Sequence, residues 1–249
     1  MFESIELRGS VVDACADAIE RAIIGGQLEV GSRLPPERRM AESFGVNRVS
    51  VRSALAKLAA AGLLKVRQGS GYVVQDYRQR GGPDLLTGLL RWAREQGDVA
   101  AIVSDLLLVR RQLARAVLER LSEKERLDLA PIRRAVEVFS NAVADGADAA
   151  ALARADLGVV VAVTAATGST VLQLCQNPVI AVVAELPQLG AAMYTEPEKN
   201  VEAYQVFLLW LGKRPIVHID QLVAAMRQRD EATVYAIRRA QTTSRRGTS

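Results

Sequence analysis

Residues 33–74 hold the pattern that most constrains how this chain folds: two helices joined by a tight turn, followed by a β-hairpin. The first helix is predicted to open at Pro36 and Glu37, since a fixed φ and an acid both suit a first helical turn. It is predicted to end at Gly45 and to carry Met40, Ala41 and Phe44 on its inward face. Asn47 can cap the next helix by accepting a hydrogen bond from a backbone N–H, and Gly62 ends that helix. Two helices joined through a glycine in this way are typical of a helix-turn-helix.

The hairpin is predicted from two short runs rich in β-branched and aromatic residues, 64–66 and 72–74. The runs flank the polar turn Gln68-Gly69-Ser70-Gly71. Glycine at such a tip lets the backbone approach a sugar-phosphate wall without a Cβ clash. The segment therefore reads as a helix-turn-helix with a β-hairpin wing.

Positive charge is concentrated in this segment. Between positions 33 and 67 there are eight Lys or Arg against two acids, a balance of +6, whereas the whole chain carries +4. After residue 80 the charges nearly cancel, with 20 Lys or Arg against 19 Asp or Glu. A cationic patch confined to one element is the electrostatic footprint expected of a protein that binds duplex DNA. The eight are Arg33, Arg38, Arg39, Arg48, Arg52, Lys57, Lys65 and Arg67.

The second helix of this segment carries side chains that can read DNA. Its apolar stripe predicts that Arg48 and Arg52 point away from the core, near an N-terminus that also holds Asn47 and Ser50. Such a helix can enter a major groove, where arginine binds guanine O6 and N7 and where Asn and Ser bind base edges or phosphates. The alternative for these side chains is an ordinary solvated helix face.

Three segments resemble the winged-helix domain of the GntR family of bacterial transcription regulators: 31–41, 44–52 and 68–74. The resemblance runs nearly continuously over about residues 10 to 76, with the segments in the family's order and spacing. Val49 departs from the small polar residue often found there. The resemblance implies DNA contacts at Arg38, Asn47, Arg48, Ser50, Arg52, Gln68 and Gly69, with Arg33 as a further phosphate contact.

Length and composition exclude several other classes. At 249 residues the chain suits one large or two small domains, and no uninterrupted run of 18 apolar residues suggests a membrane span. Glu3 stands where an export signal would carry a basic residue, so we expect a cytoplasmic protein. Cys15 and Cys175 fall in separate predicted domains and are expected to be buried, reduced hydrophobes. No nucleophile motif or phosphate-binding loop accompanies the single histidine, His218, so we do not expect an enzyme.

A polar stretch ending in Gly and Pro divides the chain, which predicts a DNA-binding domain over 1–76, a linker over 77–83, a helical domain over 84–242 and a frayed tail over 243–249. The expected fold is mainly α, with the winged helix followed by an antiparallel helical bundle. Two of its helices, 148–167 and 169–186, are so apolar that they are placed at the bundle centre. The expected helices are 84–96, 99–121, 123–144 (with a capping box at Ser122 and Glu125), 148–167, 169–186, 198–212, 217–229 and 230–242.

The helical half resembles, more loosely, the effector-binding and dimerisation domain of the FadR subfamily. Many members hold a metal with one Asp and three His. Here Asp156 matches the Asp, but Val160 and Gln241 stand at or near ligand positions, and His218 is about one residue out of register. Because a divalent ion needs three or four ligands, we expect no metal and no cofactor.

Loss of the metal bears on the effector. A metal-free site resembles the branch that responds to fatty acyl-CoA, in which an apolar tunnel between helices takes an acyl chain. The resemblance suggests that Tyr204, Phe207 and Trp210 lie near its mouth and that Arg110 faces an anionic head group. Core packing of the aromatics, and an ion pair of Arg110 with Asp105 or Asp156, are the alternatives.

Together the two halves suggest a homodimer that binds a pseudo-palindromic operator in double-stranded DNA and is released or modulated by a small molecule. A fatty acyl-CoA or fatty acid is the first expectation for the effector. There are two alternative hypotheses. The protein could respond to a small carboxylate metabolite, or it could bind DNA without any effector.

Overall fold

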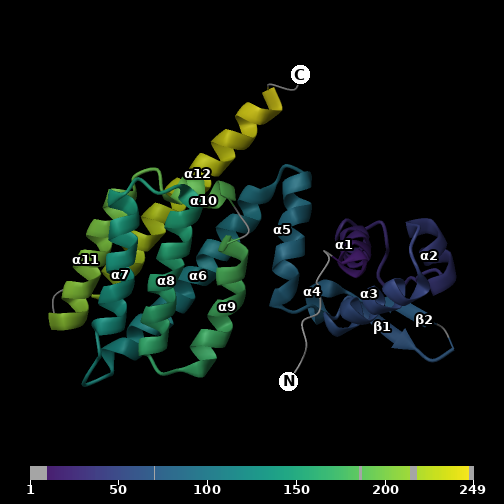
Figure 1. Ribbon diagram of the computed structural model, residues 1–249, viewed down its shortest axis with the longest axis horizontal. Helices are drawn as coiled ribbons and strands as arrows, with labels where there is room; N and C mark the ends of the chain where they lie inside the picture. The colour runs from purple at the N-terminus through teal and green to yellow at the C-terminus, as the bar shows by residue number, and fades with distance from the viewer. Residues whose placement is uncertain (1–9, 70, 185–186, 214–217, 247–249) are drawn as a thin grey trace. The chain divides into compact units, whose positions relative to one another are not determined.

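The computed structural model describes residues 10–69, 71–184, 187–213 and 218–246 (Figure 1). The chain forms two compact units, the first ending at Gln96 and the second beginning at Gly97. The first unit holds α1 (Val11–Ile24), α2 (Glu37–Phe44), α3 (Arg48–Ala60), β1 (Leu64–Arg67), β2 (Gly71–Val74), α4 (Tyr77–Arg80), the 3-10 turn η1 (Pro83–Leu85) and α5 (Leu86–Glu95). The second unit holds α6 (Val99–Ser122), α7 (Ala130–Ala144), α8 (Ala149–Ala166), α9 (Thr170–Ala184), α10 (Pro187–Met193), α11 (Pro197–Lys213) and α12 (Ile219–Arg246). The fold class predicted from the sequence is confirmed.

The core of the first unit forms where α3 packs on α1. The buried stripe predicted for α3 is present, since Val51, Ala54, Leu55 and Leu58 are all at most 2% exposed. One expectation is wrong: Phe44, at the end of α2, was expected to face inward but is exposed. Phe44 is the last residue of α2, a helix of only 8 residues, and the chain turns away directly after it at Gly45.

The wing is a two-stranded antiparallel sheet in which Leu64 pairs with Val74 and Lys65 with Val73. The loop before α2 adds to its free edge through a bridge between Arg33 and Val73. Side chains alternate across a strand, so Leu64 and Val74 enter the core while Lys65 points outward. The sheet thus has one face on the helices and one open face.

The segment expected to be a linker is ordered in the first unit. Residues 77–80 form α4, and α5 packs on α1. Ion pairs reinforce this contact, with 3.2 Å between Arg21 and Glu95 and 3.2 Å between Arg91 and Asp17. The division by contacts therefore falls after Gln96, later than the sequence boundary at 83, because α5 places its apolar face on α1.

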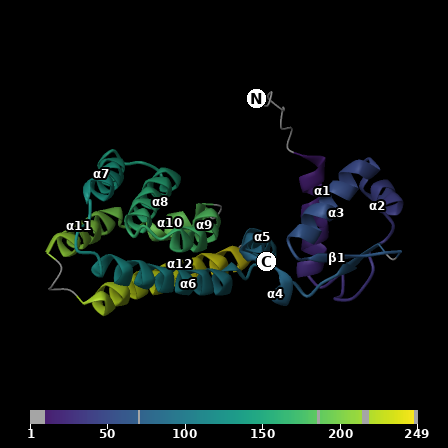
Figure 2. The ribbon, with the colours of Figure 1, turned by 90° about the horizontal axis from the view of Figure 1, so that it is seen from below.

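The second unit is a helical bundle in which α12 runs along α6, and α8 packs against α7, α9 and α10 (Figure 2). Several sequence expectations differ from it. The capping box is wrong, because Ser122 is the last residue of α6 and the next helix begins only at Ala130. The two expected helices 217–229 and 230–242 are one continuous helix, α12. The short α10 was not expected.

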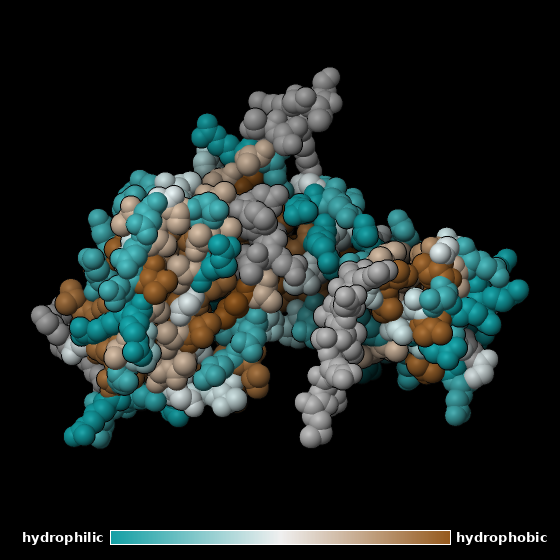
Figure 3. Space-filling view, in the orientation of Figure 1, coloured by the Kyte–Doolittle hydropathy of each residue, from teal (hydrophilic) through white to brown (hydrophobic). Residues whose placement is uncertain are grey.

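The two most apolar helices are less central than the sequence suggested. Helix α8 buries Leu152 and Val159, yet Val161 on the same helix is 52% exposed. On α9, Val171 and Leu174 are 69% and 63% exposed. Apolar surface is visible over this part of the helical unit (Figure 3). Within the described residues, α8 alone has the length and apolar character that would also suit a membrane span, and here it packs among the bundle helices.

Candidate nucleic-acid interface

The turn between α2 and α3 is held by backbone geometry. Gly45 adopts φ 65°, a left-handed conformation that glycine takes without strain. The N–H of Gly45 donates to the carbonyl of Glu42 at 3.3 Å, and the N–H of Val46 donates to the carbonyl of Ala41 at 3.0 Å. These bonds close α2 and set the angle at which α3 begins.

The first turn of α3 is capped by Asn47. Its side-chain oxygen accepts a hydrogen bond from the Ser50 N–H at 2.8 Å, as the sequence predicted. Because that oxygen is engaged, the side-chain NH₂ is the part of Asn47 that remains for a base or phosphate. The same bond brings the backbone of Ser50 into the cap, while its hydroxyl stays half-buried at the same end of the helix.

The exposed face of α3 presents arginine to solvent. Arg48 and Val49 are exposed, and Arg48 has no ion pair among the residues that the structure describes. Arg52 is also exposed, but its Nε donates to Oε2 of Glu37 on α2 at 3.3 Å. One arginine of this face is thus free and the other is held by a partner across the turn.

The remaining predicted contacts surround this face. Arg38 lies on α2 and pairs with Glu42 at 3.6 Å, with both side chains well exposed. Arg33 is exposed in the strand-like loop that pairs with β2. Gln68 and Gly69 form the exposed tip of the wing, where Gly69 has φ 71°. Ser70, at the same tip, lies outside the described residues.

Sequence reasoning missed the role of Glu37. It was read as an acid suited to the first turn of a helix, whereas the structure also gives it Arg52 as a partner. The available signal was that Glu37 is one of only two acids between positions 33 and 67. An acid within so basic a segment is a candidate partner for one of the neighbouring arginines.

An exposed cationic helix N-terminus after a tight turn, flanked by a glycine-tipped hairpin, defines a winged helix-turn-helix DNA-binding domain. The pattern of the family described as "Bacterial regulatory proteins, gntR family" matches residues 12–74. The first domain of the chain is therefore similar to the DNA-binding domain of that family.

Individual relatives are similar to part of the chain. The chain is 46% identical over 83 residues to the HTH-type transcriptional regulator Mce2R of Mycobacterium tuberculosis, covering 33% of this chain and 35% of that one. It is 33% identical over 125 residues to the HTH-type transcriptional regulator LutR of Bacillus subtilis, covering 50% and 54%. The chain thus spans about a third to a half of the length of these curated relatives.

The fold extends further than the sequence similarity. A solved structure of Lar, described as controlling the expression of the Listeria monocytogenes agr system, superposes with a TM-score of 0.59. The superposition covers 96% of this chain and 99% of that one, at 14% identity. At that identity the likeness concerns the fold of the chain, including its helical half.

In the second unit, the predicted effector residue Arg110 is held by an acid that was not expected. Its Nη2 lies 2.8 Å from Oδ1 of Asp230 on α12, and Nη1 of the neighbouring Arg111 lies 2.5 Å from the other oxygen. The alternative drawn from the sequence, an ion pair of Arg110 with Asp105 or Asp156, is therefore wrong as to the partner. The Nε of Arg110 is buried and has no hydrogen-bond partner within the part of the chain that the structure describes.

Asp156 lies inside the same unit, 8% exposed, and accepts a hydrogen bond from the hydroxyl of Tyr204. Burial, followed by the charge of Asp156 and a hydrogen bond to it, raises the pKa of Tyr194 and of Tyr204 well above the ordinary tyrosine value. The two tyrosines therefore stay neutral and can solvate the buried carboxylate.

The three predicted effector aromatics belong to the core of this unit. Tyr204 stacks edge-on against Phe139, with ring centroids 5.5 Å apart. Phe207 stacks on Trp210 with centroids 6.1 Å apart. Trp210 is 8% exposed. Core packing, one of the two readings drawn from the sequence, thus describes their contacts in this structure.

His218 lies just before α12, with its side chain exposed. Its backbone carbonyl accepts hydrogen bonds from the first turn of that helix, including the Gln221 N–H at 2.8 Å. Among the described residues, no group of three His, Cys, Asp or Glu side chains lies close enough together to hold a metal ion.

Proposed function

We propose that this protein is a transcriptional regulator that binds a pseudo-palindromic DNA operator as a homodimer and responds to a small molecule held by its helical domain. The observation that carries the proposal is the N-terminus of α3, where Asn47, Arg48 and Arg52 lie on a rigidly capped, solvent-exposed helix end. The match of residues 12–74 to the gntR family supports the same conclusion.

In the proposed complex α3 enters the major groove. Arg48 binds a base edge, the Asn47 NH₂ binds a base or phosphate, and Gln68 and Gly69 approach the backbone at the wing tip. Arg33 and Arg38 add phosphate contacts. Because each phosphate contact releases counterions, affinity falls steeply as salt rises.

A second copy of the chain is the natural partner for the apolar surface of the helical unit. Val161 on α8, and Val171 and Leu174 on α9, are each more than half exposed. A large patch of exposed apolar side chains on a protein surface often marks an interaction site. A twofold dimer through this unit would present two α3 helices to the two half-sites of an operator.

For the effector we propose a fatty acyl-CoA or fatty acid, with Arg110 facing its anionic group and Tyr204, Phe207 and Trp210 nearby. The buried Nε of Arg110, which lacks a hydrogen-bond partner in the described residues, supports an anion at this place. The same observation suits a small carboxylate, which is the second candidate. An effector can shift DNA affinity only by binding the two conformations of the protein unequally.

Operator selection tests the proposal. The purified full-length chain is incubated with a random duplex pool, bound duplexes are recovered and sequenced, and the complex is sized by analytical ultracentrifugation. We expect an inverted repeat bound by two protomers. Enrichment of no sequence at all would refute the regulatory function.

The effector is tested on the selected duplex by adding a long-chain acyl-CoA or small carboxylates in parallel. Release by acyl-CoA, lost in an Arg110→Gln variant, supports the lipid effector. Release by a carboxylate alone replaces it with the second candidate. No release by either favours a DNA-binding protein without an effector of these classes.

A further inference from the structure

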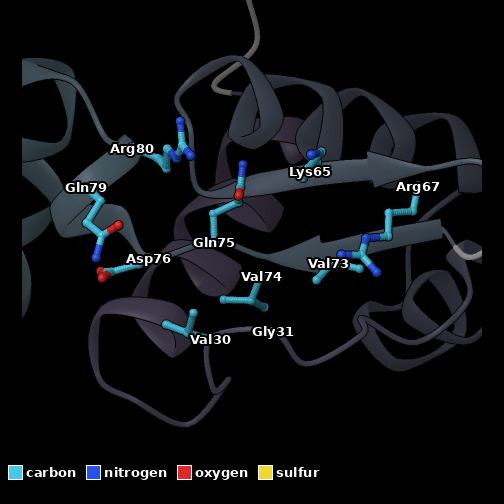
Figure 4. Close-up of a pocket in the computed structure, with 10 residues that line it drawn as sticks. All are labelled: Val30, Gly31, Lys65, Arg67, Val73, Val74, Gln75, Asp76, Gln79 and Arg80. Carbon is cyan, nitrogen blue, oxygen red and sulfur yellow. The ribbon is translucent and has the colours of Figure 1, made fainter.

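The open face of the wing sheet carries a hollow of about 310 Å³ that none of the DNA contacts above uses. It is lined by the outer face of both strands, by Val30 and Gly31 of the loop before α2, and by α4 (Figure 4). Its principal side chains are Lys65, Arg67, Val73, Gln75, Gln79 and Arg80.

The position of the hollow follows from strand alternation. Leu64 points into the core, so Lys65 and Arg67, one and three residues further on, both lie on the outer face, where Lys65 pairs with Val73. Helix α4 closes one end, since the backbone carbonyl of Arg80 packs so closely on Gly62 that a Cβ there would lie 2.2 Å from it. The hollow is therefore built from fixed backbone, with the charged ends of long side chains at its rim.

The charge in the hollow is not neutralised. Lys65, Arg67 and Arg80 have no ion pair among the residues that the structure describes. The one carboxylate in the lining, Asp76, caps α4 by accepting the Arg78 N–H at 3.1 Å. Like charges gathered in a concave surface raise the local concentration of anions.

We propose that this hollow binds phosphate groups and forms a contact separate from α3 and the wing tip. The inference rests on the proposed DNA-binding function and adds a second site to it. Phosphate suits three unpaired cations with two amide side chains beside them, because it accepts several charge-assisted hydrogen bonds at once. The phosphate comes either from DNA backbone outside the half-site or from a soluble phosphate ester.

Spacing favours the DNA backbone. Lys65 and Arg67 are two residues apart on one strand, which separates them by about 7 Å. Successive phosphates on one strand of B-DNA are separated by a similar distance along the backbone, so the two cations can contact neighbouring phosphates. The two cations lead back from the wing tip at Gln68 toward Arg80, which gives the backbone a path that continues beyond the half-site.

The test uses the full-length chain with the double variant Lys65→Gln/Arg80→Gln. Its charge-matched control is Arg94→Gln/Arg133→Gln, two exposed arginines outside the hollow. Each protein is titrated by fluorescence anisotropy with the selected operator, either cut at its ends or extended by about ten base pairs on each side (one further helical turn), over a range of salt concentrations. A parallel titration by calorimetry uses inorganic phosphate and adenosine monophosphate without DNA.

If flanking DNA supplies the phosphate, wild type and control bind the extended duplex more tightly than the short one. The double variant loses this difference, and the slope of log K against log salt falls by about two, one for each lost contact. If a soluble ester supplies it, only the calorimetric signal depends on Lys65 and Arg80. The proposal is overturned if the double variant matches the control in both titrations. Binding of the short duplex reports separately on the proposed function, because it depends on α3.

Discussion

Nε of Arg52 on α3 donates to Oε2 of Glu37 on α2 at 3.3 Å, so the two helices of the helix-turn-helix are joined by an ion pair beside the DNA-reading face. Both groups are at least partly exposed, with side-chain exposures of 65% and 30%. Exposed pairs contribute less than about 1 kcal/mol to stability. The pair is better explained as a device that orients Arg52 before DNA arrives, because a fixed side chain loses less entropy on binding.

This relationship predicts that Glu37→Gln alters specificity more than stability. The melting temperature should change little, because the pair is exposed. Removal of one negative charge should strengthen binding to random duplex, while the unfixed Arg52 gains less on the operator. The ratio of operator to random-duplex affinity should therefore fall, as measured by competition in fluorescence anisotropy. An unchanged ratio would show that the pair has no orienting role.

The cap at Asn47 can be separated from its DNA contact by two substitutions. Asn47→Ala removes the hydrogen bond to the Ser50 N–H and should cost about 1 kcal/mol of stability. Asn47→Asp keeps a capping oxygen at the helix N-terminus, so stability should be retained. Its negative charge would meet phosphate, so DNA affinity should still fall. Chemical denaturation and DNA titration of both variants make the distinction, and full DNA affinity in Asn47→Asp would exclude Asn47 from the interface.

Asp230 is predicted to contribute strongly to the stability of the packing between α6 and α12. It is 5% exposed and binds both Arg110 and Arg111, which are themselves largely buried. Asp230→Asn should destabilise the protein by about 3 kcal/mol, because two guanidinium groups lose their buried partner. Asp220→Asn is the matched control, since Asp220 joins the same two helices through an exposed pair with Arg115 and should have little effect. Equal urea midpoints for the two variants would contradict this account.

Alkaline titration should reveal Tyr194 and Tyr204. Burial first, and Asp156 second, raise the pKa of both hydroxyls, so the folded state holds these protons more tightly than the unfolded state. Stability from this source is complete below the unfolded tyrosine pKa of about 10 and is lost as pH rises above it. Ultraviolet titration of tyrosinate checks the prediction. Tyr194→Phe and Tyr204→Phe should leave the signal of the folded protein unchanged while lowering that of the unfolded protein by one of its five tyrosines each.

The first unit was largely predictable because its signals are local. Gly45, Asn47 and the glycine turn of the wing each determine a boundary through backbone conformation or capping, and the structure has these boundaries. The ion pair between Glu37 and Arg52 could not be read in the same way, since it depends on the angle between two helices. Phe44 was wrongly expected to be buried because the helical periodicity was extended to the last residue of α2, where the side chain is exposed.

The second unit was harder because its helices are apolar on exposed as well as buried faces. Val161, Val171 and Leu174 continue the hydrophobic pattern although they lie on the surface, so the pattern overstated how central α8 and α9 are. The partner of Arg110 lies 120 residues away, and nothing local selects Asp230 over Asp105 or Asp156. The sequence predicted a helix boundary at Asp230 because the residues around it are charged, whereas α12 continues through this stretch.

The central claim is that the N-terminus of α3 reads the operator, and Arg48 tests it most directly. Arg48 is exposed on the first turn of α3 and lies outside the core of the domain, so its removal should leave the fold intact. Arg48→Ala, compared with wild type and with Arg94→Ala as control, is titrated with operator and random duplex by fluorescence anisotropy. The account predicts a loss of about 1–3 kcal/mol on the operator and a smaller loss on random duplex. Operator affinity equal to that of Arg94→Ala would contradict it.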